Sequence, residues 1–302
     1  MDVSIIIVNY NTKRMTGECI DSVYAQTKGV EFEVIVVDNA SRDGSVEALK
    51  GDKRVKLIAS PENLGFGRAN NKGLEAAQGK YIFFLNSDTL LANNAVKLFY
   101  DKMEACPERV ACLGTLLRNG AGKRAKSYGE FPTVRSSLFL STAVYWLGKR
   151  FGHRWRLYDD PRREKGHFFR VPYVTGADLF VRRSVIERFG AFDKRFFMYY
   201  EETDMQRRYY MHGYYSYIYD APLIYHLEGG STKKRSRILR SRVLDLRSCY
   251  QYHRLHSSSG AYVVLRVLYP LLSLQNLFRF SSPWADRLHY VRSAFCVRVS
   301  GD

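Results

Sequence analysis

Tyr81-Ile-Phe-Phe-Leu-Asn-Ser-Asp88 joins five apolar residues directly to three polar ones. The same change from apolar to polar occurs in Val34-Ile-Val-Val-Asp-Asn39 and in Val3-Ser-Ile-Ile-Ile-Val-Asn-Tyr-Asn11. Short and nearly continuous apolar runs are typical of strands that are buried on both faces of a parallel sheet. Since ligands bind beyond the carboxyl ends of the strands in such a sheet, the three segments predict one polar rim with a binding site.

The aspartates at this predicted rim have two possible explanations. An aspartate beside five apolar residues is costly to bury unless a hydrogen bond, a cation or solvent compensates its charge. A bound ligand would supply that compensation for Asp38 and Asp88. The alternative is that both residues cap the helices that follow them, because Asp and Asn are preferred at helix N-termini. Three polar strand ends together favour the binding site.

Strand-like and helix-compatible segments alternate along the chain, which predicts an α/β fold with a mostly parallel, Rossmann-like sheet covered by helices on both faces. The predicted strands are 3–8, 33–37, 55–59, 81–85, 110–117 and 216–225. The predicted helices are 15–26, 44–49, 65–77, 94–106 and 184–189. We expect a catalytic domain over 1–232 and a helical appendage over 233–302, with Ser257-Ser-Ser-Gly260 as a hinge.

The net charge of +17 is distributed unevenly. Residues 1–117 and 171–232 are close to neutral, whereas 118–170 and 233–302 carry net charges of +9 and +10. A basic surface can hold nucleic acid, anionic lipid or a phosphorylated small molecule. We interpret 118–170, which is also rich in aromatic residues, as a basic insertion in the domain predicted over 1–232.

The carboxyl-terminal region contains a strongly apolar segment, 261–280, which is interrupted by Arg266, Pro270, Gln275, Asn276 and Arg279. It falls short of the about 20 uninterrupted apolar residues that a spanning helix needs. An apolar stripe flanked by arginine and aromatic residues is typical of a helix that lies in the bilayer interface and is attracted to anionic head groups. We expect an anionic membrane surface as a partner. The alternative is a terminal helix that packs on the core.

The cysteines and the amino terminus bear on the cellular compartment. The five cysteines are scattered and form no C-x-x-C pair, so they indicate neither a disulfide framework nor a zinc site. The chain starts directly with a predicted strand, and no signal-peptide pattern precedes it. We expect a cytoplasmic protein that is peripheral on the inner face of the cytoplasmic membrane.

The sequence lacks the two common phosphate-binding loops, G-x-G-x-x-G after the first strand and G-x-x-x-x-G-K-[ST]. A phosphate ligand would therefore need metal charge or side chains. Asp88, with Asn86 two residues earlier, can offer oxygen ligands to a divalent cation that also contacts a diphosphate. His226, at the end of a later predicted strand, can complete that site or be an ordinary surface histidine.

Three carboxylates follow a bulky aromatic run in Phe196-Phe-Met-Tyr-Tyr-Glu-Glu-Thr-Asp204. Aromatic walls and like charges raise the pKa of a carboxyl group and suit it to general base catalysis. The alternative is a helix start with acidic residues favoured by the helix dipole and with Asp204 paired to Arg208 four residues on. That alternative leaves Glu201 and Glu202 unexplained.

Taken together, these motifs resemble the inverting nucleotide-sugar glycosyltransferases of family 2, which have the GT-A fold, from residue 3 to about residue 231. The resemblance rests on seven motifs in a fixed order, which are Val3-Ser-Ile-Ile-Ile-Val-Asn-Tyr-Asn11, Val36-Val-Asp-Asn-Ala-Ser-Arg-Asp-Gly-Ser45, Asn63-Leu-Gly-Phe-Gly-Arg-Ala-Asn70, Leu85-Asn-Ser-Asp-Thr89, Thr175-Gly-Ala-Asp178, Phe196-Phe-Met-Tyr-Tyr-Glu-Glu-Thr-Asp204 and His226-Leu-Glu-Gly-Gly-Ser231.

The resemblance assigns roles on the donor side. Asp38 would accept a hydrogen bond from a pyrimidine ring, and Asn9, Asn63 and Gly65 would line the nucleotide pocket. Asn86-Ser-Asp88 occupies the place of the family's Asp-x-Asp motif. Asp88 would then be a ligand of Mg²⁺ or Mn²⁺, with His226 as a supporting ligand.

The resemblance also assigns roles on the acceptor side, where we expect the basic and aromatic insertion 118–170. Glu202 matches the acidic residue that deprotonates the acceptor hydroxyl, and Gly176, Ala177 and Asp178 would line the donor sugar and the acceptor. Two departures stand out. Asn86 replaces the first Asp of Asp-x-Asp, which makes metal dependence less strict, and Glu202 stands where Asp is commoner, which leaves Glu201 as an alternative base.

The predicted activity is the inverting transfer of a sugar, with L-rhamnose from dTDP-rhamnose favoured because the Asn-x-Asp form resembles bacterial rhamnosyltransferases. The predicted acceptor is a hydroxyl of a lipid-linked or cell-surface polysaccharide precursor. A UDP-hexose donor is the alternative within this chemistry. A sugar-phosphate nucleotidylyltransferase would instead carry a Gly-rich, Arg-containing loop after its first strand. A nucleic-acid-binding protein would not need the acidic cluster, which would repel phosphates, so we expect no nucleic-acid partner.

Overall fold

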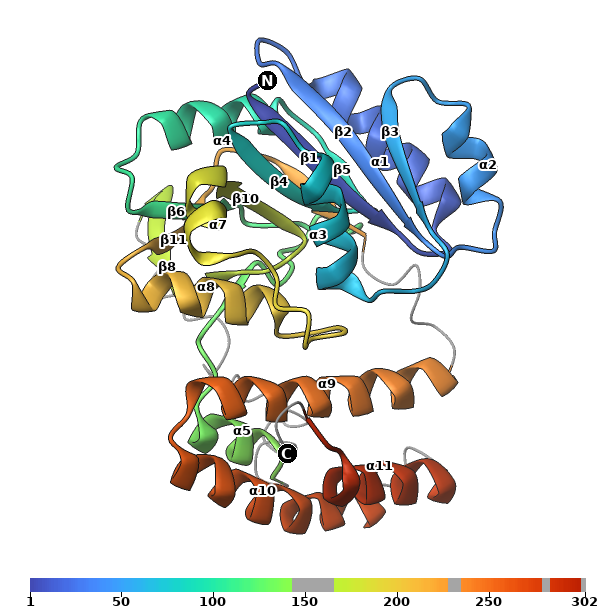
Figure 1. The fold of residues 1–302 in the computed structure, drawn as a ribbon, viewed down its shortest axis with the longest axis vertical. Helices are drawn as coiled ribbons and strands as arrows, with labels where there is room; N and C mark the ends of the chain where they lie inside the picture. The colour runs from blue at the N-terminus through green and yellow to red at the C-terminus, as the bar shows by residue number, and fades with distance from the viewer. Residues whose placement is uncertain (143–165, 228–234, 279–282, 300–302) are drawn as a thin grey trace. The chain divides into compact units, whose positions relative to one another are not determined.

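The computed structural model describes residues 1–142, 166–227, 235–278 and 283–299 (Figure 1). The chain divides into two compact units, which we call the α/β unit and the helical unit. The α/β unit comprises residues 1–130, 159–194 and 201–231, and the helical unit comprises residues 131–158, 195–200 and 232–302.

An eight-stranded mixed sheet forms the centre of the α/β unit. Its spatial order is β3 (Val55–Ser60), β2 (Phe32–Asn39), β1 (Val3–Asn9), β4 (Tyr81–Asn86), β10 (Asp178–Arg182), β6 (Val110–Gly114), β11 (Tyr215–Tyr219) and β8 (Phe168–Val171). The first four strands are parallel, and β10 lies antiparallel between β4 and β6. The chain therefore reverses its direction of winding between β1 and β4, which is where such sheets bind ligands.

Helices cover both faces of this sheet, which confirms the predicted α/β class. One hydrophobic core joins the sheet to α1 (Lys13–Gln26), α2 (Ser45–Lys50) and α4 (Ala95–Glu104). The other core joins the opposite face to α3 (Phe66–Ala76), α7 (Arg183–Phe189) and α8 (Glu201–Met211). Figure 1 shows α3 in front of the sheet and α1 behind it. Because both faces are covered, the apolar residues of the central strands are fully buried.

The prediction of one strand over 216–225 is wrong. The segment forms β11 and then, after a turn that contains Pro222, a separate short strand β12 (Ile224–His226). Proline has no backbone N–H to donate to a strand ladder, so the strand ends before it. β12 pairs with β5 (Thr89–Leu91) in a second sheet, and this pairing brings His226 to the end of β4.

A third, two-stranded sheet lies next to the same edge. It pairs β7 (Tyr128–Gly129) with β9 (Tyr173–Val174). The backbone N–H of Thr175 donates to the carbonyl oxygen of Ser127 at 3.0 Å. The first residues of the basic insertion therefore lie beside the segment that contains Gly176.

The helical unit consists of α5 (Val134–Leu140), α9 (Arg235–His256), α10 (Ser259–Ser273), a 3₁₀ helix η2 (Leu274–Phe278) and α11 (Trp284–Cys296). Its core contains Leu246, Tyr250, Tyr262, Leu265 and Tyr290. Residues 131–142 and 195–200 group with these helices, although the sequence analysis gave them to the catalytic domain. The predicted hinge at 257–260 is the break between α9 and α10, inside this unit, and Ser258 Oγ accepts from the N–H of Ala261 there.

Candidate active site

The first polar cluster lies at the carboxyl ends of β1 and β2. Asn9 and Asp38 are opposite each other in the register of these strands. Asn9 Nδ2 donates to Asp38 Oδ2 at 2.6 Å, and the backbone N–H of Ser41 donates to Asp38 Oδ1 at 2.9 Å. Both side chains are fully buried. The pair therefore lies buried beneath the polar strand ends. Direct contact of Asp38 with a nucleobase stays a prediction.

Helix capping does not explain the rim aspartates. The helix after β2 begins at Ser45, and its first N–H groups are served by Asp43, whose Oδ1 accepts from the N–H of Ser45 at 3.2 Å. Asp88 is followed by a strand, β5, and not by a helix. The capping alternative is therefore wrong for Asp38 and for Asp88.

Hydroxyl groups join the ends of β1 and β4 at the point where the winding reverses. Thr12 Oγ1 lies 3.1 Å from Ser87 Oγ and donates to Asn9 Oδ1 at 2.8 Å. Thr16 Oγ1 donates to the same oxygen at 2.7 Å. The amide of Asn9 is thus bonded at both ends, which fixes its orientation. The structure brings the predicted donor-side residues Asn9 and Ser87 together through Thr12.

The loop before α3 is held to the end of β2. Asn39 Nδ2 donates to Asn63 Oδ1 at 3.0 Å, and the N–H of Leu64 donates to Asn39 Oδ1 at 2.8 Å. Asn63 Oδ1 also accepts from the N–H of Gly65 at 2.9 Å. Gly65 has φ +81°, a conformation that favours glycine. The predicted nucleotide-pocket residues Asn63 and Gly65 therefore share one ordered loop at the rim.

Asp88 and His226 form the candidate metal-binding pair. His226 is opposite Thr89 in the register of β12 and β5, and its Nε2 lies 3.2 Å from Asp88 Oδ1. Two ligand atoms about 2.1 Å from an octahedral ion and at right angles are about 3 Å apart. The separation in this structure therefore fits neighbouring positions around one divalent cation.

The pair does not fill a coordination shell by itself. Among the described residues, no group of three His, Cys, Asp or Glu side chains can hold a metal ion. Mg²⁺ is commonly bound through one or two carboxylates together with substrate phosphates and water. Asn86 Nδ2 is 3.5 Å from His226 Nε2, so it borders the same position. The residues present fit a site that a diphosphate completes.

Residues 175–178 connect this pair to the acidic helix α8. The backbone N–H of Asn86 donates to the carbonyl oxygen of Ala177 at 3.0 Å. The neighbouring Gly176 packs against Glu202, since a Cβ atom on Gly176 would lie 3.9 Å from Glu202 Cβ. A Cβ atom on Gly176 would lie 3.2 Å from the ring of Phe66, so glycine allows this close approach. Two adjacent residues thus separate the β4 end from Glu202.

Asp178 is the last residue of this loop and the first residue of β10. It is fully buried, and its Oδ2 accepts from the backbone N–H of Thr115 at 2.6 Å. Its Oδ1 has no hydrogen-bond partner in the part of the chain that the structure describes. Burial raises the pKa of this carboxyl well above its usual value. The bond to Thr115 indicates that Asp178 fixes the end of the loop to the segment after β6. Its contact with a sugar stays a prediction.

The two glutamates at the start of α8 have different surroundings. Glu201 is 3% exposed and packs against α3, where a Cβ on Gly67 would lie 3.3 Å from Glu201 Cβ. Its Oε2 has no hydrogen-bond partner among the described residues. Glu202 is partly exposed and packs against Gly176. Of the two, Glu202 is the residue that faces the 175–178 loop.

Both glutamates have raised pKa values. Burial is the main cause in each case, and the negative charge of Glu202 raises the pKa of Glu201 further. The positive charge of the exposed Lys126 and the N–H of Gly176 act in the opposite direction on the pKa of Glu202. A carboxylate with a moderately raised pKa is a better proton acceptor near neutral pH. The smaller rise in the pKa of Glu202 makes it the better suited of the two glutamates for general base catalysis.

Gln206 anchors α8 to the strand that precedes this loop. Its Nε2 donates to the carbonyl oxygen of Val174 at 2.8 Å, and its Oε1 accepts from the N–H of the same residue at 2.8 Å. Ser216 Oγ also donates to Gln206 Oε1 at 2.8 Å. Gln206 is one helical turn after Glu202, so this buried amide sets the position of Glu202 relative to Gly176.

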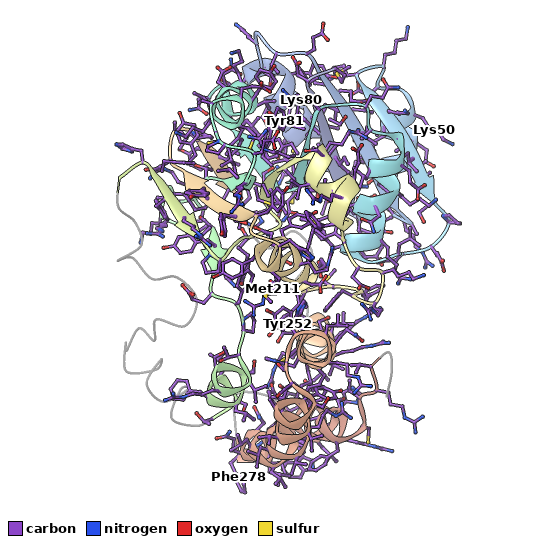
Figure 2. All side chains as sticks on the ribbon, turned by 60° about the vertical axis from the view of Figure 1, so that its left-hand side comes forward. Lys50, Lys80, Tyr81, Met211, Tyr252 and Phe278 are labelled. Atoms are coloured by element: carbon purple, nitrogen blue, oxygen red, sulfur yellow. The ribbon has the colours of Figure 1, made fainter. Side chains whose placement is uncertain are left out.

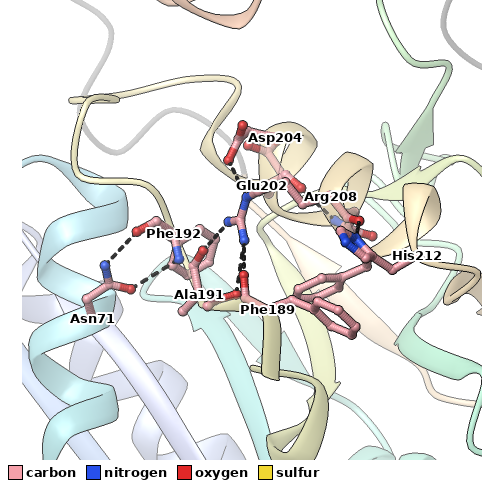
Figure 3. Close-up of polar contacts among 11 residues, drawn as sticks. Asn71, Phe189, Ala191, Phe192, Glu202, Asp204, Arg208 and His212 are labelled. Carbon is pink, nitrogen blue, oxygen red and sulfur yellow. Dashed lines mark hydrogen bonds and ion pairs between the residues drawn. The ribbon is translucent and has the colours of Figure 1, made fainter. Parts of the chain in front are cut away.

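The far side of α8 is held by Arg208 (Figure 3). Arg208 Nε bonds to Asp204 Oδ2 at 3.1 Å, which confirms the pairing expected from their spacing. The same guanidinium donates to the carbonyl oxygens of Phe189 and Ala191. Asn71 on α3 forms hydrogen bonds with the backbone of Phe192. These contacts clamp the loop between α7 and α8, so Asp204 has a structural role.

Sequence reasoning missed three residues that define this site. Thr12 and Lys126 have no local pattern that singles them out. Gln206 had a usable signal, since a polar residue one turn after Glu202 on the same helix face is expected to be buried beside it.

The comparisons with known proteins identify the family. The family model described as "Glycosyl transferase family 2" matches residues 4–190, which is more than half of the chain. The chain belongs to glycosyl transferase family 2. The match extends over every rim residue from Asn9 to Asp88 and ends before α8.

Curated relatives cover part of the chain. A "Succinoglycan biosynthesis protein ExoO" of Rhizobium meliloti is 35% identical over 160 residues, 50% of this chain and 46% of that protein. An "N-acetylglucosaminyl-diphospho-decaprenol L-rhamnosyltransferase" of Mycobacterium tuberculosis is 26% identical over 207 residues, 64% of this chain and 66% of that protein. The chain thus spans less than two thirds of the length of these relatives.

Solved structures share the fold. The mannosyltransferase PcManGT from Pyrobaculum calidifontis, in complex with GDP-Man and Mn²⁺, has a TM-score of 0.57 and 17% identity, over 97% of this chain and 85% of that chain. GalNAc-T7 with UDP, GalNAc and Mn²⁺ has a TM-score of 0.62 and 14% identity, over 99% and 55%. At these identities the likeness shows the fold alone, and it confirms the GT-A-like architecture expected from the sequence.

Proposed function

We propose that this chain is an inverting glycosyltransferase that moves a sugar from a nucleoside diphosphate to an acceptor hydroxyl. The bridge of Gly176 and Ala177 carries the proposal, because Ala177 is hydrogen-bonded to Asn86 at the β4 end and Gly176 packs against Glu202. A single displacement needs a base on the acceptor side of the anomeric carbon and a leaving diphosphate on the other side. Inversion at that carbon follows from one such step.

Glu202 is the proposed general base. Its carboxylate would accept the proton of the acceptor hydroxyl while the hydroxyl oxygen forms a bond to the anomeric carbon and the bond to the diphosphate breaks. Burial raises the pKa of Glu202, and the charge of Lys126 acts in the opposite direction. Glu201 is the less suited residue, since its buried carboxyl points toward α3.

Asp88 and His226 are the residues that would hold a divalent cation, and Mn²⁺ or Mg²⁺ bound there would stabilise the negative charge of the leaving diphosphate. The buried pair of Asn9 and Asp38 and the ordered loop with Asn63 would shape the pocket for the nucleoside. The family match includes Asn9, Asp38, Asn63 and Asp88, whereas His226 lies outside it.

We propose dTDP-L-rhamnose as the donor and a saccharide linked to a polyprenyl diphosphate as the acceptor, in the synthesis of a cell-surface polysaccharide. Support comes from the similarity to the mycobacterial L-rhamnosyltransferase along 64% of this chain. The similarity to a succinoglycan biosynthesis protein supports a role in polysaccharide synthesis. UDP-hexose donors are the second arm of the test.

The test measures nucleoside diphosphate release from dTDP-sugars and UDP-sugars, with an acceptor and with Mn²⁺ or Mg²⁺. We expect Glu202→Gln to lower kcat by about 10²- to 10⁴-fold, because the amide cannot accept the proton. The pKa of Glu202 is raised above 4.5, the ordinary value for glutamate. We therefore expect wild-type activity to be lost as the pH is lowered, with a midpoint above 4.5.

Two further variants make this test decisive. Glu187→Gln, on the exposed face of α7, is the matched surface control and should leave kcat unchanged. Glu201→Gln separates the two neighbours. A large loss in Glu201→Gln with normal turnover in Glu202→Gln would transfer the base role to Glu201, and normal turnover in both variants would refute the acidic helix as the catalytic site.

A further inference from the structure

We propose that the outer face of α10, η2 and α11 docks in the plane of an anionic lipid bilayer without crossing it. The inference concerns a surface of the helical unit and does not depend on the proposed function. Within the described residues, the stretch Ser259–Phe278 is the one helical segment whose length and composition would suit a membrane span, and 28% of it is buried. The distribution of its side chains distinguishes docking from spanning.

From residue 262 onward, the exposed face of this segment is apolar. Between residues 262 and 278, every exposed side chain is aliphatic or aromatic, namely Val263, Val264, Val267, Leu268, Leu271, Leu274 and Phe278. Their exposures reach 58% at Val263 and 74% at Phe278, which is labelled in Figure 2. A water-facing helix normally places charged residues on this side. A contiguous apolar face of this kind marks an interaction surface.

The opposite face of the same segment packs within the helical unit. Tyr262, Leu265 and Ser273 are buried against the neighbouring helices. Arg266, the single charged residue between 259 and 278, turns inward: its Nη1 donates to the carbonyl oxygen of Val297 at 2.8 Å, and its guanidinium lies 4.5 Å from the ring centre of Tyr250. A spanning helix would have to break these contacts, so the packing favours insertion of one face.

The surroundings of the apolar face fit the head-group layer of a membrane. Trp284 and Leu288 on α11 are 57% and 49% exposed, and the guanidinium of Arg287 lies 5.4 Å from the ring of Trp284. Tryptophan beside arginine is typical of the interface between hydrocarbon and head groups. The region 233–302 carries a net charge of +10. That charge would repel a second copy of this unit and attract an anionic surface.

The test uses the full chain and vesicles of phosphatidylcholine, either alone or with roughly one third phosphatidylglycerol. We expect co-sedimentation with the anionic vesicles and little with the neutral ones. The double variant Val267→Glu/Leu271→Glu should lower the partition coefficient at least about tenfold, because two inserted aliphatic side chains become charged. Met211→Glu, at an exposed apolar position of the α/β unit, is the matched control and should bind like wild type.

A second measurement does not rely on the double variant being folded. With Trp146 and Trp155 replaced by Phe, the fluorescence of Trp284 should shift to shorter wavelength with anionic vesicles and be quenched by brominated acyl chains. Alkaline carbonate should release the bound protein. Equal partition of the double variant and wild type, or no change at Trp284, would refute the proposal. Resistance to carbonate would show a spanning helix. Self-association without vesicle binding would assign the apolar face to a second copy of the chain. Either result would overturn in-plane docking.

Discussion

The α/β unit and the helical unit place polar and apolar side chains in opposite ways. In the α/β unit, strand residues such as Ile6 and Phe84 are fully buried, and polar residues such as Asp88 lie at the strand ends. In the helical unit, His253 and Asn276 are buried, while Leu271 faces outward. The α/β unit therefore has polar side chains at the ends of its strands, whereas the helical unit has an apolar outer face.

His253 and Asn276, two buried polar residues of the helical unit, have hydrogen-bond partners within that unit. His253 Nε2 lies 2.8 Å from Ser137 Oγ, and its Nδ1 lies 2.9 Å from Ser257 Oγ. Arg242 Nη2 donates to Asn276 Oδ1 at 3.1 Å, and its guanidinium lies 4.0 Å from the ring of Tyr290. Paired polar groups cost little to bury. The buried polar residues therefore need no contact with water at the outer face of α10, η2 and α11. That face can be apolar, as the proposed contact with a lipid bilayer requires.

Removing the metal pair should break the chemistry of the α/β unit and leave the helical unit intact. We expect Asp88→Ala to lower donor turnover at least about a hundredfold, because one of the two side chains for the cation is lost. His226→Ala should also weaken Mn²⁺ binding, measured by electron paramagnetic resonance with the nucleoside diphosphate present. Vesicle partition should be unchanged in both variants.

Asp101→Ala, at an exposed position paired with Lys97, is the control for this prediction and should retain turnover and Mn²⁺ binding. Unchanged Mn²⁺ binding in Asp88→Ala and in His226→Ala would show that the cation, if used, is bound elsewhere.

Acid should weaken the helical unit through His253. Burial, with a smaller effect from the charge of His256, lowers the pKa of His253 from the usual 6.5 to about 4. The unfolded chain therefore binds a proton between pH 6.5 and pH 4 that the folded unit does not, so stability is present above 6.5 and is lost as the pH falls. We expect a loss of about 2 kcal/mol in the free energy of unfolding between pH 7 and pH 5.

Urea unfolding, followed through the fluorescence of Trp284 in the single-tryptophan protein, measures this loss in the helical unit. His253→Asn should reduce the pH dependence, since the titrating group is removed. His212→Gln on α8 in the α/β unit is the matched control. An equal pH dependence in wild type and His253→Asn would refute the assignment.

Much of the α/β unit was predictable because its signals are local. Continuous apolar strands such as 34–37 mark their own position, and the polar residues after them share one rim by the geometry of parallel sheets. The break in 216–225 has a local signal in Pro222 that the prediction of one strand passed over, whereas the pairing of β12 with β5 is a long-range contact. That pairing is also what brings His226 to Asp88.

The helical unit was less predictable for the same reason. The sequence analysis predicted helices in 233–302 from their composition, but residues 131–142 join them only through tertiary packing, as in the bond between Ser137 and His253. The inward turn of Arg266 likewise depends on Tyr250 and Val297. In the candidate active site, the preference for Glu202 over Glu201 as the proposed base depends on the positions of Gly67 and Gly176 on other elements.

The smallest effect that we predict sharpens the comparison within the α/β unit, where one buried polar group positions the proposed base. Gln206→Leu removes the paired hydrogen bonds to Val174 and leaves the backbone of β9 unpartnered by α8. We expect kcat to fall about tenfold with the KM for the donor little changed, because Glu202 shifts relative to Gly176 while the rim stays intact. Gln206→Glu keeps one acceptor for the N–H of Val174 and should lose less. An equal rise in the donor KM for both variants would indicate a general loosening of the fold, and unchanged kcat in Gln206→Leu would remove Gln206 from the positioning of the base.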